Sequence, residues 1–373
     1  MKKIIIMLSV ILFAVCLPLT AVGEEDYLSE IYRQSGADRI EDSLGDTAKE
    51  FFESENIDPA DYNWVNSLKA ENVFSHIWTF VKSGAKEPFR AGFILLAIIL
   101  LAAAVRAFKS DSQVDASVKL VVTLAACGTI IYGVFGSINS AVNAIKGTGS
   151  FMMAFVPVYM GIMSVSGAPI SAASSGGMLL FAAEFTGGAA AFLITALMGA
   201  YLAVSISAGV SPLLSGTGLS DVLKKSGMWI MSFCTTVFLG VLTAQNAVNT
   251  AADSLSVRTA RFILGTCVPV AGTALSGAVK TVSSSLSLLK SSVGIYGVVA
   301  LAVMLLPIFA ELLLWRLVLT ASGAVCKLFS IEETSKLFKA VDGMLAFLLG
   351  VLALVAATFI ISLSVCISAG GAV

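Results

Sequence analysis

Three charged residues interrupt long apolar runs of this sequence: Glu184, Glu311 and Arg316. Charges inside apolar segments are costly, so they usually pair with one another or face water. Glu311 and Arg316 are five residues apart, which is not the spacing of partners on one helix face. Glu184 has no charged neighbour, so it is predicted either to face a water-filled cavity or to lie at an interface near a helix start. Arg316 could equally extend to the membrane surface.

Residues suited to bond-making chemistry are scarce. His76 is the single histidine, so neither a Ser–His–Asp set nor a histidine-based metal site can be assembled. The six cysteines include no Cys-x-x-Cys pair, and the glycine-rich stretches lack the spacing of a phosphate-binding loop. We therefore expect no catalytic residue, no metal site and no cofactor, and the chain is predicted not to be an enzyme.

The amino-acid composition indicates whether most of this chain lies in water or in a lipid bilayer. Of 373 residues, 57% are hydrophobic and 13% are charged, and the mean hydropathy is +0.92. A soluble protein carries about 25% charged residues, so a soluble enzyme, a nucleic-acid binder and a disordered chain are all excluded. We expect an all-α, polytopic helical membrane protein, with the lipid bilayer as its main partner and no nucleic acid.

Charge divides the chain into unlike regions. Residues 24–88 carry fifteen Asp and Glu against six Lys and Arg, whereas residues 91–373 carry nine against fourteen. Before this acidic region, Lys2 and Lys3 precede an apolar run and then small residues, which is the plan of a signal peptide. We predict a signal peptide over 1–23 cleaved after Gly23, a small acidic extracytoplasmic helical region over 24–89, and a polytopic domain over 90–373. An uncleaved first membrane helix is the alternative.

Apolar length predicts about six to eight membrane segments, because a crossing needs about 20 residues. Six runs are clear: 91–108, 118–138, 178–207, 228–244, 293–320 and 344–364. Two weaker runs, 151–165 and 262–279, contain Pro157 and Pro269. Proline frees a backbone carbonyl and bends or breaks a helix, so these two prolines and Pro307 are candidate helix breaks or pore-lining positions, a packing kink being the ordinary alternative.

The two proline-containing runs resemble each other and indicate an internal duplication. Val156-Pro157-Val158 precedes Ser166-Gly167-Ala168, and Val268-Pro269-Val270 precedes Ser276-Gly277-Ala278. The predicted repeats cover about 117–208 and 223–321. They are inverted if each proline run crosses the membrane and parallel if each re-enters it. Counting basic residues does not decide, but both arrangements put the acidic region and the C-terminal tail outside.

An extended pattern after Val257 identifies a family. Arg258-Thr259-Ala260-Arg261-Phe262 leads to Val268-Pro269-Val270-Ala271-Gly272, then to Leu275-Ser276-Gly277-Ala278 and Leu306-Pro307. This run, with the proline motif at 156–158 and the acidic region, closely resembles the stage III sporulation protein AE family of endospore-forming bacteria. The resemblance covers nearly the whole chain. It adds Gly272 to the candidate breaks or pore-lining positions and carries no catalytic residue.

The resemblance implies a non-enzymatic, multi-pass subunit of the mother-cell membrane around the forespore. Such proteins belong to a channel or secretion-like complex that joins mother cell and forespore and is required for endospore development. Implied partners are the other stage III sporulation proteins of the A group, including a cytosolic ATPase, and a forespore membrane protein. From the duplicated proline runs, a stand-alone secondary transporter for a small solute is the alternative, and an assembly scaffold without a conduit is a third hypothesis.

Overall fold

The computed structural model describes residues 38–57, 64, 70–108, 112–190, 194–201, 203, 217–267 and 272–369. Within these ranges the regular structure is helical and no strand is present, so the predicted all-α class is confirmed. The elements, in chain order, are α3 (Asp38–Ser43), α4 (Asp46–Ser54), α6 (Ala70–Phe108), α7 (Ser112–Val165), α8 (Pro169–Glu184), the π-helix η1 (Phe185–Ala190), α10 (Thr217–Cys267), α11 (Gly272–Leu328) and α12 (Glu332–Ser368).

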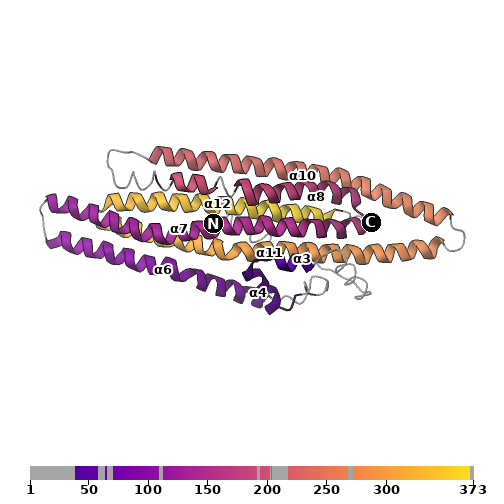
Figure 1. Cartoon of the computed structure of the whole chain (residues 1–373), viewed down its shortest axis with the longest axis horizontal. Coiled ribbons are helices and arrows are strands. Elements are labelled where there is room, and N and C mark those ends of the chain that lie inside the picture. Colours follow the sequence, from indigo (N-terminus) through magenta and orange to yellow (C-terminus); the bar gives the residue numbers. More distant parts are fainter. Residues whose placement is uncertain are drawn as a thin grey trace.

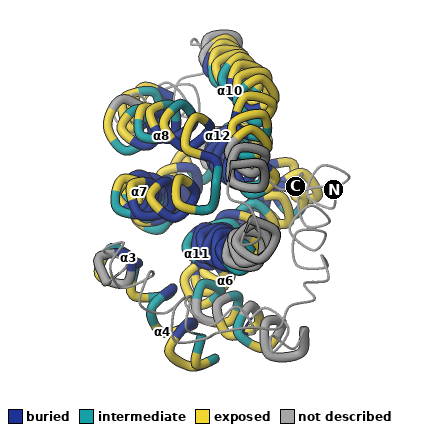
Figure 2. Tube along the Cα trace, turned by 90° about the vertical axis from the view of Figure 1, so that its right-hand side faces the viewer, coloured by how far each residue is buried: buried dark blue, intermediate teal, exposed yellow. Residues whose placement is uncertain are grey.

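The long helices lie side by side along one axis, and consecutive helices run in opposite directions (Figure 1). α11 and α12 form the centre of the bundle, with α6 and α7 packed against α11. α8 and α10 lie beyond α12, where α10 presents a long exposed face (Figure 2). The short helices α3 and α4 pack on the side of α7 and α11.

The helices are far longer than a membrane requires. α7 has 54 residues and therefore spans about 80 Å, against about 30 Å for the hydrocarbon core of a bilayer. Among the described residues, five helical segments are long and apolar enough to cross a membrane, located in α6, α7, α10, α11 and α12. The prediction of a polytopic helical membrane protein is confirmed, and only part of each long helix fits inside a bilayer.

The expected helix breaks at Pro157 and Pro307 are absent, and that prediction was wrong. α7 runs without interruption through Pro157 and joins the predicted runs 118–138 and 151–165 into one helix. Pro307 likewise lies inside continuous α11. Proline removes one helical hydrogen bond at about 3 kcal/mol, whereas each helix is fastened by buried side chains on both sides of its proline, such as Phe155 and Tyr159 in α7. Pro269 and the predicted cleavage at Gly23 lie outside the described residues, and Gly272 is the first residue of α11.

The Ser-Gly-Ala sequences that follow the two proline motifs do not occupy equivalent structural positions. Ser166-Gly167-Ala168 forms the turn from α7 to α8, where Gly167 adopts a φ of +96° that favours glycine. Ser276-Gly277-Ala278 instead lies within α11. The hairpins α7–α8 and α10–α11 nevertheless turn toward the same end of the bundle (Figure 1). The internal duplication stays a prediction, and these two hairpins would be its units.

Candidate functional site

Glu311 lies where α6, α7 and α11 meet. It is half-buried, and its Oε1 accepts a hydrogen bond from Ser137 Oγ of α7. On the α6 side, a Cβ placed on Gly84 would lie 3.6 Å from Glu311 Cβ, so the absence of a side chain there lets α6 approach. A carboxylate in an apolar bundle needs hydrogen-bond donors, and the serine of the neighbouring helix supplies one.

Arg316, further along α11, forms an ion pair with α12. Its Nε lies 2.8 Å from Asp342 Oδ1 and its Nη2 lies 3.4 Å from Asp342 Oδ2, which is the two-pronged geometry that suits a guanidinium and a carboxylate. The two side chains are 35% and 24% exposed, so solvent weakens the attraction but does not remove it. Glu311 and Arg316 are thus held by different helices, α7 and α12.

Near the level of Glu311, Arg316 and Asp342 along the bundle, α12 also packs against α10. Phe347 follows Asp342 by five residues on α12, and a Cβ on Gly227 of α10 would lie 2.8 Å from its ring. Lys225, two residues earlier, is exposed. We call this cross-section the charged layer, and its members are Gly84, Ser137, Lys225, Gly227, Glu311, Arg316, Asp342 and Phe347.

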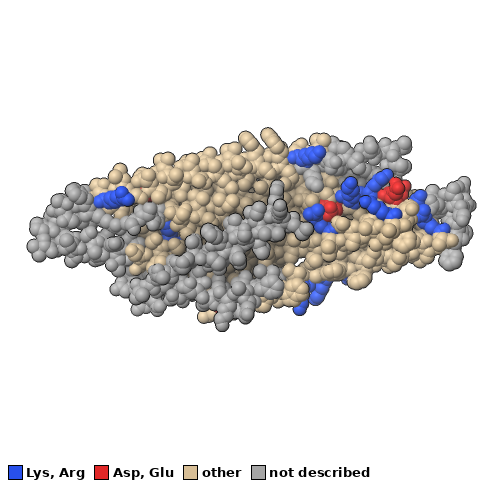
Figure 3. Space-filling model, turned by 180° about the vertical axis from the view of Figure 1, so that it is seen from behind, with Lys and Arg blue, Asp and Glu red and all other residues tan. Residues whose placement is uncertain are grey.

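One end of the bundle is basic. Lysine and arginine side chains gather there over the α6–α7 and α11–α12 connections (Figure 3). Arg106 Nη1 donates a 2.6 Å hydrogen bond to the carbonyl of Phe329, which ties the end of α6 to the end of α11. The basic end, as used below, comprises Arg106, Lys119, Lys327, Lys336 and Lys339.

Between the charged layer and the basic end, α6, α7 and α11 expose large apolar side chains. Phe93 is 72% exposed, Val121 63% and Tyr132 84%. On α7 the exposed residues directly after Phe135 are Gly136, Asn139, Asn143 and Lys146, and exposed apolar side chains return at Met153 and Val165. An apolar surface of this length bounded by charge fits the lipid-facing surface of a membrane protein. We call it the apolar belt: Phe93, Ile94, Leu100, Leu101, Val105, Leu120, Val121, Leu124, Ile131, Tyr132, Phe135, Leu313 and Leu317.

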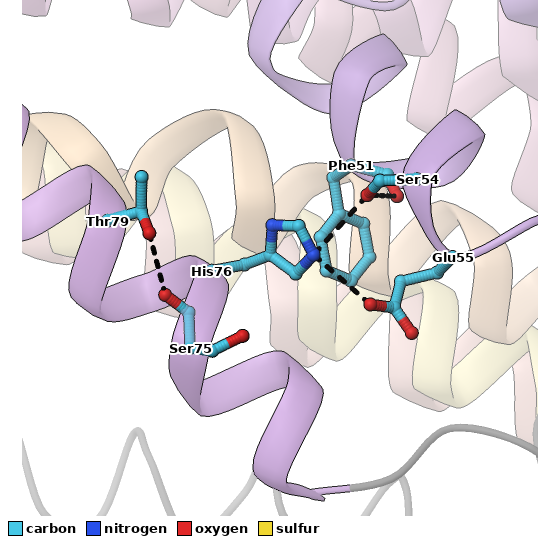
Figure 4. A network of polar contacts seen from close by, with 6 residues as sticks. All are labelled: Phe51, Ser54, Glu55, Ser75, His76 and Thr79. Atoms are coloured by element: carbon cyan, nitrogen blue, oxygen red, sulfur yellow. Dashed lines mark hydrogen bonds and ion pairs between the residues drawn. The ribbon is translucent and has the colours of Figure 1, made fainter.

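The acidic helices dock on the far side of the charged layer. Phe52 of α4 stacks on Tyr296 of α11 with ring centroids 4.2 Å apart. His76 Nε2 of α6 lies 3.1 Å from Glu55 Oε1 and 3.3 Å from Ser54 Oγ, which joins α6 to the end of α4 (Figure 4). These contacts hold a polar, acidic segment beside the middle of α11.

Glu184 does not join the charged layer. It is the exposed last residue of α8, and the π-helix η1 begins at the next residue. Glu311 and Arg316 share the layer, so two of the three predicted intramembrane charges lie near each other. The candidate pore-lining roles of Pro157, Pro269, Gly272 and Pro307 stay predictions.

Two charged residues that were not predicted are buried away from the layer. Asp253 of α10 is 1% exposed, and its two carboxylate oxygens each accept a 2.9 Å hydrogen bond, from the backbone N–H groups of Ile170 and Ser171 at the start of α8. Lys290 of α11 is 2% exposed and donates to the carbonyl of Ala369 at the end of α12. Asp253 offsets the partial positive charge at the start of α8, and Lys290 offsets the partial negative charge at the end of α12, as expected from the helix dipole.

The described residues assemble no centre for bond-making chemistry. Within them, no group of three or more His, Cys, Asp or Glu is placed to hold a metal ion. Cys127, Cys326 and Cys366 are buried and free, and Cys234 is free and exposed. The fold and the charged layer therefore define a multi-pass α-helical membrane protein whose described intramembrane charges join helices.

Comparison with known proteins identifies the kind of membrane protein. Residues 66–370 match the family described as stage III sporulation protein AE, so the chain belongs to that family. It is similar to stage III sporulation protein AE of Bacillus subtilis (strain 168), at 28% identity over 234 residues, which is 63% of this chain and 59% of that protein. No solved structure matches. The predicted family is confirmed, and a role in sporulation is supported.

Proposed function

We propose that the chain is a non-enzymatic integral-membrane subunit of the channel or secretion-like complex between mother cell and forespore. The observation that carries the proposal is the family match over 66–370, which includes every described helix long enough to cross a membrane. Because the matched part of the Bacillus subtilis protein is 59% of its length, the complex and its partners are inferred for this chain from the family resemblance.

The charge distribution supports an orientation for this subunit. Cytoplasmic loops of membrane proteins carry an excess of lysine and arginine, so the basic end faces the mother-cell cytoplasm. The acidic helices α3 and α4 lie on the other side of the charged layer, in the space between the two membranes. A signal peptide cleaved after Gly23 would deliver them there.

This orientation separates two docking regions. The basic end is accessible to a cytosolic ATPase of the same complex. The acidic region 24–89 is available to the other A-group proteins and to a forespore membrane protein. With fifteen acidic against six basic residues over 24–88, its docking is expected to favour basic partner surfaces and to weaken as salt rises.

The alternative of a stand-alone transporter has lost part of its motivation. It rested on helices broken by proline, as in transporters with discontinuous helices, and α7 and α11 are continuous through Pro157 and Pro307. We therefore propose no second function.

Deletion of the gene in its own host tests the role directly. We expect arrested sporulation with small forespores and reduced late forespore gene expression, restored by the wild-type gene. Normal sporulation of the deletion strain would exclude the proposal. Co-purification from sporulating cells should recover the other complex subunits, and substrate-dependent flux by the purified protein alone in vesicles would favour the transporter.

Orientation is tested by labelling with a membrane-impermeant maleimide in intact cells. Both probes are placed in a Cys234→Ser background. A cysteine replacing exposed Glu50 in α4 should be labelled from outside, whereas one replacing exposed Glu333 beside the basic end should be labelled only after lysis. The reverse pattern would invert the proposed topology.

A further inference from the structure

A pocket opens between the acidic helices and the bundle, at the place where α4 lies on α11. Its volume is about 590 Å³, and ligand pockets in proteins usually measure about 300–1,000 Å³. Its walls come from α3, α4, the residues that directly follow these two helices, and α11. We call it the acidic-region pocket, and it is lined by Asp42, Leu44, Lys49, Phe52, Glu53, Asn56, Ile57 and Tyr296.

The floor of the pocket is apolar and is fixed by packing. Leu44, Phe52 and Tyr296 are buried, and the rings of Phe52 and Tyr296 stack with their centroids 4.2 Å apart. On the opposite face of α4, the ring of Phe51 meets the ring of His76 of α6 edge-on, at 5.3 Å between centroids (Figure 4). Because α4 is held by two helices of the bundle, the floor of the pocket is rigid.

The turn that ends α4 builds one edge of the pocket. Asn56 has a φ of +50°, in the left-handed region that asparagine tolerates. The next residue, Ile57, donates its backbone N–H to the carbonyl of Phe52 in a 3.0 Å hydrogen bond. Such a turn closes the end of a helix, so backbone hydrogen bonds hold Ile57 close to the apolar floor.

The rim of the pocket is polar and faces water. Asp42, Glu53 and Asn56 are exposed, and exposed carboxylates are costly to place in lipid. Of the lining residues, only Tyr296 belongs to a candidate membrane span, and Phe52 covers its ring. The pocket is therefore open to a partner that approaches through water.

The charge around the pocket indicates the kind of partner. Residues 38–57 carry seven Asp and Glu against two Lys and Arg, a net of −5. In the lining itself, the carboxylates of Asp42 and Glu53 outnumber the ammonium of Lys49. Such a surface attracts basic partners and repels acidic ones. An apolar floor inside a polar rim is also the usual arrangement where one apolar side chain anchors a protein interface.

We propose that the acidic-region pocket binds a basic segment of a partner protein. An apolar side chain of that segment lies on the floor, and its neighbouring lysine or arginine side chains pair with Asp42 and Glu53. The proposal deepens the docking role of the acidic region and rests on the proposed function, which puts this region in the space between the two membranes.

Photocross-linking in sporulating cells of the host tests the proposal. The photoreactive amino acid p-benzoylphenylalanine replaces Lys49, which lines the pocket, and in a second strain it replaces the adjacent Glu50, which is exposed and does not line it. Ultraviolet light should join the Lys49 probe to another protein, with about fivefold or more adduct than the Glu50 probe gives. Mass spectrometry should locate the cross-link in a segment where an apolar residue is flanked by lysine or arginine.

Charge reversal tests whether the rim recognises that segment. Glu53→Lys should lower the yield of the Lys49-probe adduct by about tenfold or more, because repulsion between like charges replaces a charge-assisted hydrogen bond. Glu50→Lys is the matched control and should leave the yield nearly unchanged. An unchanged yield in Glu53→Lys would contradict recognition by the rim.

The remaining outcomes separate this proposal from the proposed function. Absence of a Lys49-probe adduct, equal yield from the Glu50 probe, an adduct within this chain or with a small molecule, or a cross-linked segment without basic residues would each overturn the pocket proposal. If any of these occurred in a host whose deletion strain arrests sporulation, the proposed function would stand and the pocket proposal alone would fail.

Discussion

Asp253 carries a strong local prediction, because one buried carboxylate holds the start of another helix. Its two oxygens each accept a 2.9 Å hydrogen bond, from the N–H groups of Ile170 and Ser171, and the residue is 1% exposed. The first N–H groups of a helix have no partner within the helix. Asp253→Ala therefore leaves two donors without an acceptor, in a place where the bundle admits little water.

The expected loss of stability is about 3–7 kcal/mol. Hydrogen bonds to charged groups contribute about 1.5–3 kcal/mol each, and the loss of charge at the helix N-terminus adds up to about 1 kcal/mol. Asp253→Asn should lose less, because its side-chain oxygen still accepts one of the two bonds. A destabilisation of 3 kcal/mol lowers the unfolding midpoint by about 6–12 °C in a protein of a few hundred residues.

Thermal unfolding of the purified protein in detergent, followed by circular dichroism, measures this loss. Ser256→Ala is the matched control, since Ser256 is an exposed polar residue three positions along the same helix. Hydrogen exchange should also quicken at the start of α8 in Asp253→Ala. If Asp253→Ala and Ser256→Ala melted within one degree of each other, the proposed fastening of α8 by α10 would be refuted.

Three further substitutions test other contacts. Arg316→Ala should destabilise the purified protein by about 1–2 kcal/mol, and adding Asp342→Ala should cost less than the two single losses combined, as a double-mutant cycle of melting temperatures would measure. Gly149→Ala should destabilise, since its Cβ would lie 2.8 Å from the carbonyl oxygen of Ala183, whereas Gly161→Ala on the same helix meets open space and should be neutral or stabilising. Phe52→Ala removes a ring stacked on α11, costs about 3 kcal/mol of docking energy, and should release the acidic helices to limited proteolysis while the bundle stays folded.

Apolar runs located the helices correctly and underestimated their lengths. Every predicted run outside the undescribed residues falls within a helix, but α6 begins at Ala70, whereas the predicted run begins at residue 91. The sequence before residue 91 includes Lys82, Lys86 and Arg90, which ended the apolar window. A helix needs only backbone hydrogen bonds and side-chain packing to continue. Charge therefore marks where a helix leaves lipid, not where it ends.

Because the predicted runs are shorter than the helices, the sequence also misses two charged residues that connect helices. Asp342 precedes the predicted run 344–364, and Asp253 lies between the predicted runs 228–244 and 262–279. Because both residues fall outside the apolar runs, the sequence offers neither as a partner for an intramembrane charge. Both lie inside helices, and each finds its partner on a different helix, Asp342 on α11 and Asp253 on α8. One sequence records which residues are charged but not which helices are neighbours.

Hydropathy also misidentifies which helix meets the lipid. The span in α12 has a mean hydropathy of 2.8 and is 61% buried within the bundle, whereas the span in α10 has a mean hydropathy of 1.6 and is 11% buried. The most apolar helix is thus covered by other helices, because helix neighbours and lipid tails offer apolar side chains equally good surroundings. α10 is less apolar, and most of its candidate span is exposed on the outside of the bundle.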